Sequence, residues 1–254
     1  MEQAQKFARL RRFNIIMACL HFISGLVMLI LSTDLKVPVT ASFLKFDVLT
    51  QKLFPQMSTL FEIRLGYLVA SFLFVSALAH LVISLPWFNQ KYNSGLAKGI
   101  NIFRWIEYSI SSSLMIVVIA LLVGISDIAT LIAFIFVNAS MILFGWMMEL
   151  HNQCTSKTNW TAFIFGCIAG VGPWIGIAIY LASPGSTSNP PTFVYWIFFS
   201  IFIFFNIFAI NQILQYKKIG KWSDYLYGER AYIILSLVAK SLLAWQVFAG
   251  TLRP

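Results

Sequence analysis

One lysine, Lys240, lies in the middle of an apolar stretch from Ala231 to Ala249, and it is the only lysine inside any of seven such stretches. A charged side chain at the centre of a bilayer costs roughly 2.5–3.5 kcal/mol on insertion scales, so it persists there only where it is paired, neutralised or used in chemistry. A primary amine inside a helix bundle can form an imine with an aldehyde. The pattern therefore predicts an aldehyde cofactor bound at Lys240.

Glu107 is the predicted partner of Lys240, because a buried cation needs an anion and Glu107 is the only carboxylate deep in a predicted span. Glu62, Glu149 and Glu229 fall at predicted span edges, where we expect interfacial anchors. The alternative to a functional pair is an ion pair that only stabilises the bundle. Buried ion pairs seldom stabilise more than apolar packing does, which favours the functional interpretation.

Four further polar side chains lie near this pair in the predicted bundle. Ser236 precedes Lys240 by four residues and shares its helix face, and Ser76 stands in the same relation to His80. His21 and His80 are candidate proton acceptors, because neutral imidazole titrates at about pH 6.5. The alternative for each serine is a hydrogen bond from its hydroxyl to a backbone carbonyl of its own helix. The alternative for the two histidines is a hydrogen-bonded contact that joins their helices.

The remaining polar and aromatic positions have simpler interpretations. Arg104 is expected to extend toward the lipid headgroups. No zinc site is predicted, since His151 ends a span and no third ligand converges with the other two histidines. Trp174 and Phe205 lie at mid-span, where aromatic rings usually form core but would also enclose a polyene.

Composition defines the elements that carry these residues. Of 254 residues, 59% are hydrophobic and 11% are charged, against about 25% charged in soluble domains. The predicted spans are 13–32, 62–85, 100–123, 127–148, 160–182, 192–215 and 229–251. Backbone groups in lipid must be satisfied internally, so we expect an all-α, rhodopsin-like bundle of seven transmembrane helices forming one domain, 1–254. Seven helices with an amine in the last one predict a retinal-binding photoreceptor.

The long loop at 33–61 has a pattern of its own. Val37, Val39, Ala41 and Phe43 alternate with their neighbours, which predicts a small β-hairpin after the first helix.

Lysine and arginine predict the orientation. Ten lie on the side of the N-terminus, four on the other side, and four within or at the edges of spans, which accounts for all 18. The ten are Lys6, Arg9, Arg11, Arg12, Lys91, Lys98, Lys157, Lys217, Lys218 and Lys221. We therefore expect a cytoplasmic N-terminus and an extracellular C-terminus. The net charge of +9 does not indicate nucleic-acid binding, because the basic residues lie at span ends.

Several segments together resemble one family. They are Asn101–Ser113, Val137–Trp146, Gly166–Gly170, Pro173–Gly176, Pro184–Ser188, Lys221–Leu226 and Gly228–Ser241. In these segments the sequence is similar to the heliorhodopsins, over nearly the whole chain.

The resemblance implies all-trans retinal, bound through a protonated Schiff base to Lys240 with Glu107 as counterion. It implies a polar cavity around the Schiff base formed by Ser236, Ser76, His21 and His80. It further implies a chromophore lined by Asn138, Met141, Trp174 and Phe205. A homodimer, membrane lipid as surroundings, a slow photocycle and no ion pumping are also expected of the family.

Two positions support the absence of pumping independently. Retinal proton pumps carry an acid four residues before the retinal lysine and another eleven residues after the counterion; here these positions hold Ser236 and Val118. The expected function is a light sensor, not an enzyme, with an unidentified cytoplasmic partner near the basic segment 217–221. One alternative is a light-gated or passive proton channel through Glu107, His21 and His80. The other is a non-photochemical transporter or enzyme with a buried Lys–Glu pair.

Overall fold

The computed structural model describes residues 2–182 and 190–253. The matching segment 184–188 lies outside the described residues. The elements in chain order are α1 (Glu2–Leu31), β1 (Lys36–Asp47), β2 (Lys52–Arg64), α2 (Leu65–Ser84), α3 (Pro86–Ala97), α4 (Ile102–Leu122), α5 (Ile128–His151), α6 (Thr161–Ala182), α7 (Thr192–Tyr216) and α8 (Tyr225–Val247). Within the described residues, seven helices are long and apolar enough to cross a membrane, as the sequence predicts.

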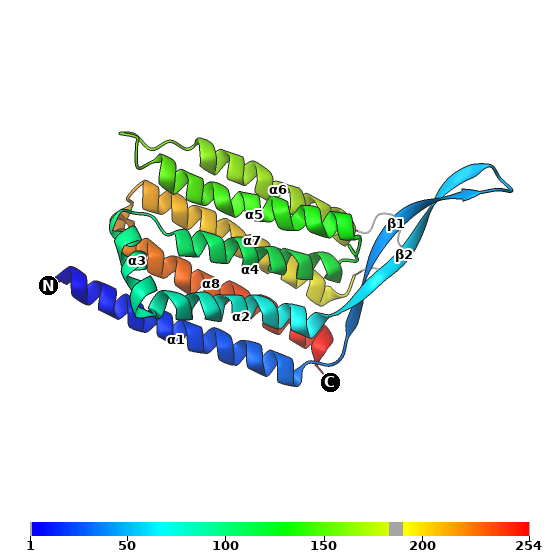
Figure 1. Cartoon of the computed structure of the whole chain (residues 1–254), viewed down its shortest axis with the longest axis horizontal. Coiled ribbons are helices and arrows are strands. Elements are labelled where there is room, and N and C mark those ends of the chain that lie inside the picture. Colours follow the sequence, from blue (N-terminus) through cyan, green and yellow to red (C-terminus); the bar gives the residue numbers. More distant parts are fainter. Residues whose placement is uncertain (1, 183–189, 254) are drawn as a thin grey trace.

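The seven long helices run side by side, with the two chain ends at opposite ends of the bundle (Figure 1). Helix α4 lies at the centre: 72% of its most apolar stretch is buried, against 17% for α5 and for α7. Helix α4 packs mainly against α5 and α2, and its buried side chains share one core with those of α2 and α8, including Phe72, Ile116 and Leu243, each 0% exposed. A residue on α4 therefore has protein neighbours on most sides, which favours this helix as the carrier of a buried site.

Helix α3 is an element that the sequence did not predict. It begins with Pro86 at its first turn, where proline's missing N–H costs nothing. It lies at the same end of the bundle as the N-terminus (Figure 1). Its Tyr92 and Leu96 are buried in a core cluster with residues of α1, α2 and α8, so α3 packs against the bundle near this end.

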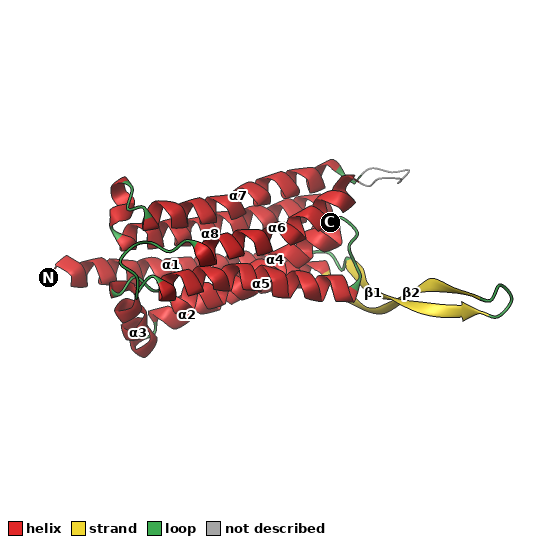
Figure 2. Ribbon diagram, turned by 90° about the horizontal axis from the view of Figure 1, so that it is seen from above, coloured by secondary structure: helices red, strands yellow, loops and turns green. Residues whose placement is uncertain are grey.

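The predicted hairpin is present and longer than expected. Strands β1 and β2 pair antiparallel from Lys36 with Arg64 to Asp47 with Lys52. Because β2 continues to Arg64, α2 begins at Leu65 rather than at residue 62 as predicted. The hairpin projects from the end opposite the N-terminus (Figures 1 and 2).

Among the described residues, close contact between the hairpin and the bundle is found at the base of the hairpin. The Thr40 N–H donates to the carbonyl of Ser126 at 2.9 Å, and the two hydroxyls lie 3.0 Å apart. At the far tip, the Thr50 hydroxyl and the Leu49 N–H donate to the Asp47 carboxylate and hold its pKa below the usual range.

Candidate functional site

Lys240 and Glu107 meet in the interior of the bundle. The Nζ of Lys240 on α8 donates to Oε1 of Glu107 on α4 at 2.7 Å and to the Ser236 hydroxyl at 2.8 Å. The Ser76 hydroxyl on α2 donates to the same Glu107 oxygen at 2.7 Å. The side chains of Lys240 and Glu107 are 4% and 7% exposed, and Lys240 is the only buried lysine among the described residues. Three helices therefore join one amine, one carboxylate and two hydroxyls.

The two histidines lie beside this group. Their rings on α1 and α2 stack, with centroids 5.7 Å apart and planes 11° apart. Nδ1 of His80 lies 2.8 Å from Oδ1 of Asn14, a buried residue that sequence reasoning missed. His21 is 0% exposed, and neither of its ring nitrogens has a hydrogen-bond partner within the described part of the chain. The four polar residues predicted around Lys240 and Glu107 thus do gather there.

A cavity of about 250 Å³ opens on the other side of Lys240, between α4, α5, α6, α7 and α8. Lys240, Ser236, Met141, Trp174 and Phe205 all line it. Trp174 packs edge-on against Phe205, with their ring centroids 5.4 Å apart. The wall is mainly apolar and aromatic, and a primary amine lies at its edge. A cavity with an apolar wall and one amine fits a long hydrophobic aldehyde, and retinal is such a molecule.

Asn138 has a different place from the one expected. It does not line the cavity; its amide donates to the hydroxyls of Ser112 at 2.8 Å and Ser113 at 3.1 Å. Ser112 does line the cavity, so Asn138 acts on the wall through a neighbour. Asn138 is 2% exposed and lies between α4 and α5, so Ser112 and not Asn138 faces the cavity.

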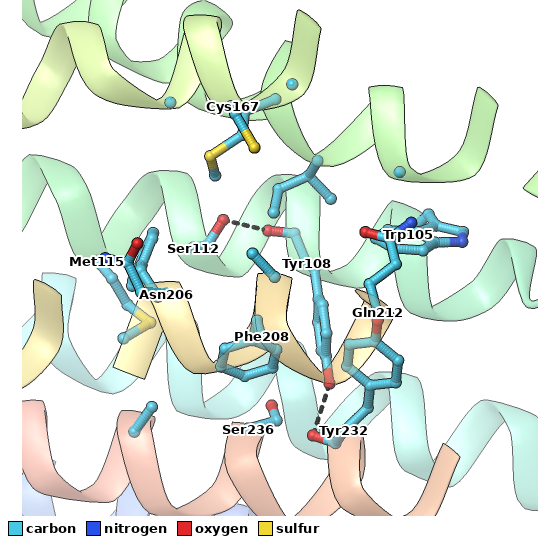
Figure 3. A pocket seen from close by; sticks show the side chains of 18 of the residues that line it. Trp105, Tyr108, Ser112, Met115, Cys167, Asn206, Phe208, Gln212, Tyr232 and Ser236 are labelled. Atoms are coloured by element: carbon cyan, nitrogen blue, oxygen red, sulfur yellow. Dashed lines mark hydrogen bonds between the residues drawn. The ribbon is translucent and has the colours of Figure 1, made fainter. Parts of the chain in front are cut away.

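Helix α4 supplies wall residues that sequence reasoning did not select. Trp105, Tyr108, Ser112 and Met115 recur at intervals of three and four residues, which places them on one helix face. Figure 3 shows Tyr108 extending from α4 toward Tyr232 of α8, to whose carbonyl its hydroxyl donates at 2.8 Å. The recurrence of these four residues at helical intervals, close to Glu107 in the sequence, was a signal that could have identified this wall of the cavity.

A second charged group lies nearer the end of the bundle where α3 packs. Arg104 on α4 forms ion pairs with Glu149 of α5, at 2.5 Å, and with Glu229 of α8. Arg104, Glu149 and Glu229 are 5%, 1% and 2% exposed. The expectation that Arg104 extends to the headgroups is wrong, and so is the assignment of the two glutamates as interfacial anchors.

Further donors complete this Arg104–Glu149–Glu229 cluster. Glu149 accepts from Trp105 Nε1 at 2.6 Å, from the Asn101 N–H at 2.8 Å and from the Tyr225 hydroxyl at 2.9 Å. Glu229 accepts from the Asn101 side chain at 2.7 Å and from the Tyr92 hydroxyl at 2.9 Å. Tyr92 belongs to α3, so the unpredicted helix covers Glu229, a carboxylate that the sequence places at a span edge.

Comparison with known proteins agrees with this arrangement. No curated protein matches the chain. The family model described as heliorhodopsin matches residues 10–252, which is nearly the whole chain and includes most of α1 and all of the other six long helices. The protein therefore belongs to the heliorhodopsin family, the retinal-carrying, light-sensing rhodopsins of multi-pass membrane type.

Proposed function

We propose that this protein is a light sensor that carries all-trans retinal as a protonated Schiff base on Lys240, with Glu107 as the sole carboxylate counterion, and that it does not pump ions. One observation carries the proposal. The only buried lysine of the described chain lies at the wall of an apolar cavity, 2.7 Å from a buried carboxylate. A structural ion pair alone would not need the cavity beside it.

Bound retinal supplies absorption of visible light and a change of shape on isomerisation. The chain's own residues do the rest. Glu107 balances the positive charge at the Lys240 nitrogen, and the hydroxyls of Ser76 and Ser236 fix the positions of these two groups. Met141, Trp174 and Phe205 enclose the polyene, and Asn138 holds the wall through Ser112.

The surroundings of the pair support the absence of pumping. A vectorial relay needs a proton donor and a second acceptor along a path to each surface. Val118, where pumps carry an acid, is 0% exposed within the apolar core, and Ser236 is bonded to Lys240 itself. A proton leaving the Lys240 nitrogen therefore stays within the buried polar network of the bundle, which begins at His21, His80, Ser76 and the water near them. Slow return of this proton gives a slow photocycle.

We further propose a cytoplasmic N-terminus, a homodimer, and a cytoplasmic partner that meets the basic segment 217–221. The orientation rests on the ten-to-four distribution of lysine and arginine. Epitope tags on each end, probed in intact and permeabilised cells, test it. An N-terminal tag accessible on intact cells would reverse the orientation.

The decisive experiment adds all-trans retinal to the purified apoprotein and records the visible spectrum. Wild type is expected to become coloured, and Lys240→Ala to remain colourless while keeping its helical circular dichroism. The matched control is Lys217→Ala, which removes an exposed lysine at the end of α7 and should become coloured like wild type. A coloured Lys240→Ala variant would remove the assignment.

Illuminated vesicles separate the sensor from the two transport functions. The sensor produces no sustained pH change that an uncoupler abolishes. A steady light-driven pH gradient would indicate a pump. A photocurrent that follows the applied voltage would indicate the proton channel through Glu107, His21 and His80.

A further inference from the structure

A small second cavity, of about 30 Å³, lies between the two charged groups. Asn14, His80 and Glu107 line it on one side, and Asn101, Arg104 and Glu229 on the other. Since one ordered water needs roughly 10–15 Å³ of such space and two or more polar partners, there is room for about two waters. Water here would connect the Lys240–Glu107 pair to the Arg104–Glu149–Glu229 cluster by hydrogen bonds.

The two glutamates of the cluster differ in how fully they are bonded. A carboxylate has about four lone-pair sites. Glu149 uses all four: Arg104 and Tyr225 donate to Oε1, and the Asn101 N–H and Trp105 donate to Oε2.

Glu229 has three donors, because Tyr92 and Asn101 donate to Oε1 and only Arg104 donates to Oε2. One lone pair of Glu229 therefore remains, and this glutamate, unlike Glu149, lines the small cavity.

Charge also favours an added proton in the cluster. Two ionised carboxylates face one guanidinium, so the cluster carries one negative charge in excess. Arginine keeps its proton in proteins, so only a carboxyl can change this balance. Protonation of one glutamate makes the cluster neutral.

His80 is a weaker candidate for the final acceptor. Asn14 donates its amide to the Leu10 carbonyl at 3.1 Å, which leaves its Oδ1 to accept from Nδ1–H of His80. Nε2 is then the only ring nitrogen left to accept a proton, and taking one there would make His80 a buried cation, whereas a proton on Glu229 removes a buried excess negative charge. Glu107 lies 2.7 Å from Lys240, so a proton held there returns readily.

We propose that Glu229 is the residue that holds the proton in the light-activated state. The inference rests on the proposed function and deepens it. One N–H bond at the Lys240 nitrogen breaks as Glu107 takes its proton, Glu107 gives a proton to the first bridging water, each water passes on one proton and gains another, and one O–H bond forms at Oε2 of Glu229. Glu229 is 2% exposed, and Tyr92, which does not line the cavity, donates to it from α3, so the proton returns by the same route. Glu229 thus stores the proton during the light-activated state and does not export it.

Infrared difference spectroscopy of the retinal-loaded protein, light minus dark, tests this. The light state of wild type should gain the C=O stretching band of a protonated carboxyl. Glu229→Gln should lose that band, while Glu149→Gln should keep it.

Two tyrosines on opposite glutamates give a matched pair that leaves the carboxyls in place. Tyr92→Phe removes a hydrogen bond from Glu229 and should shift the band, since carbonyl frequency follows hydrogen bonding. Tyr225→Phe removes one from Glu149 and should leave the band unshifted. This pair decides the matter even where Glu229→Gln does not fold.

The outcomes are distinguishable. Wild-type protein that stays colourless with retinal overturns the proposed function and this inference with it. Coloured protein whose light state lacks a carboxyl band, or has one that neither Glu229→Gln nor Tyr92→Phe changes, overturns this inference alone. The second result would leave the proton on water, on a histidine or on Glu107.

Discussion

Two buried charged groups lie in one bundle, and they are built differently. Lys240 and Glu107 form a balanced pair with two serine hydroxyls, beside a cavity of about 250 Å³. Arg104 lies between two carboxylates, and the ring centroids of Tyr232 and Trp105 lie 4.0 and 4.6 Å from its guanidinium carbon. The first group has few bonds and space to react; the second has many bonds and little space.

The choice of cation matches this difference. Lysine can lose its proton and form a covalent bond through a flexible chain, whereas arginine stays charged and its planar fork bridges two carboxylates. The chain thus uses its reactive cation where a cofactor can bind, and its unreactive one where three helices must be held together. Burial alone does not separate a reactive charge from a structural one; the number of bonded donors and the adjoining space do.

Breaking the cluster should have the largest effect on stability. Arg104→Gln leaves two buried carboxylates without a cation, and removing one partner of a buried pair costs about 3–5 kcal/mol. We expect a large drop in the free energy of unfolding, measured by denaturant titration of the apoprotein in detergent. Arg104→Lys should recover only part of it, because a point charge cannot bridge both carboxylates. Full recovery would show that charge alone matters here.

Changing the counterion should alter colour instead. Glu107→Gln removes the anion that stabilises positive charge at the Lys240 nitrogen. The visible band should move to longer wavelength, or give way to near-ultraviolet absorption where the nitrogen loses its proton. Glu149→Gln is the same substitution in the cluster and should leave the absorption maximum in place. If both variants shifted the band equally, the two regions would not be electrostatically separate.

Gly145 connects the two regions. A Cβ on this residue would lie only 2.4 Å from a ring carbon of Trp105, which lines the large cavity and donates to Glu149. Gly145→Ala should therefore destabilise the protein by about 1–3 kcal/mol, as overpacking does, and also shift the visible band. Gly172→Ala on α6 is the control, since its Cβ would lie 3.9 Å from Val137 in ordinary contact. Thermal unfolding and absorption spectra measure both effects.

The smallest effect should come from Ser76. Ser76→Ala removes one of two hydrogen bonds to Oε1 of Glu107 and leaves the charge pair intact. The band should shift in the direction of Glu107→Gln by a small fraction of that change. Ser71→Ala, whose hydroxyl donates only to the Leu68 carbonyl of its own helix, should leave the spectrum unchanged. A shift in Ser76→Ala as large as in Glu107→Gln would mean that the hydroxyl orders the carboxylate.

The reactive group could be predicted from the sequence because its signals are local. Lys240 stands out as an amine in an apolar run, and Ser236 is four residues away on the same face. The pairing with Glu107 required only that one carboxylate lie deep in another span. Asn14 could not be found in this way, because it follows Arg11 and Arg12 and its burial depends on α2 packing over it.

The burial of Glu229 could not be predicted because it depends in part on an element without a strong sequence signal. Helix α3 has few apolar residues, and only its packed position covers Glu229 through Tyr92. The hairpin was predicted in place but not in length. Pro55 lies within β2 and interrupts the strand pattern, yet a two-stranded sheet tolerates it because each strand has an open edge.

The hairpin has a consequence for labelling the molecule. In β1, Val39 to Ala41 are buried at the base, whereas Ser42 to Phe46 are exposed and the turn at 48–51 is fully outside the bundle. Exposed loop tips accept insertions more readily than packed backbone does. A small reporter protein or affinity tag inserted at this turn would therefore lie at the end of the two-stranded hairpin, away from the large cavity. It would mark one membrane face and leave both chain ends unmodified.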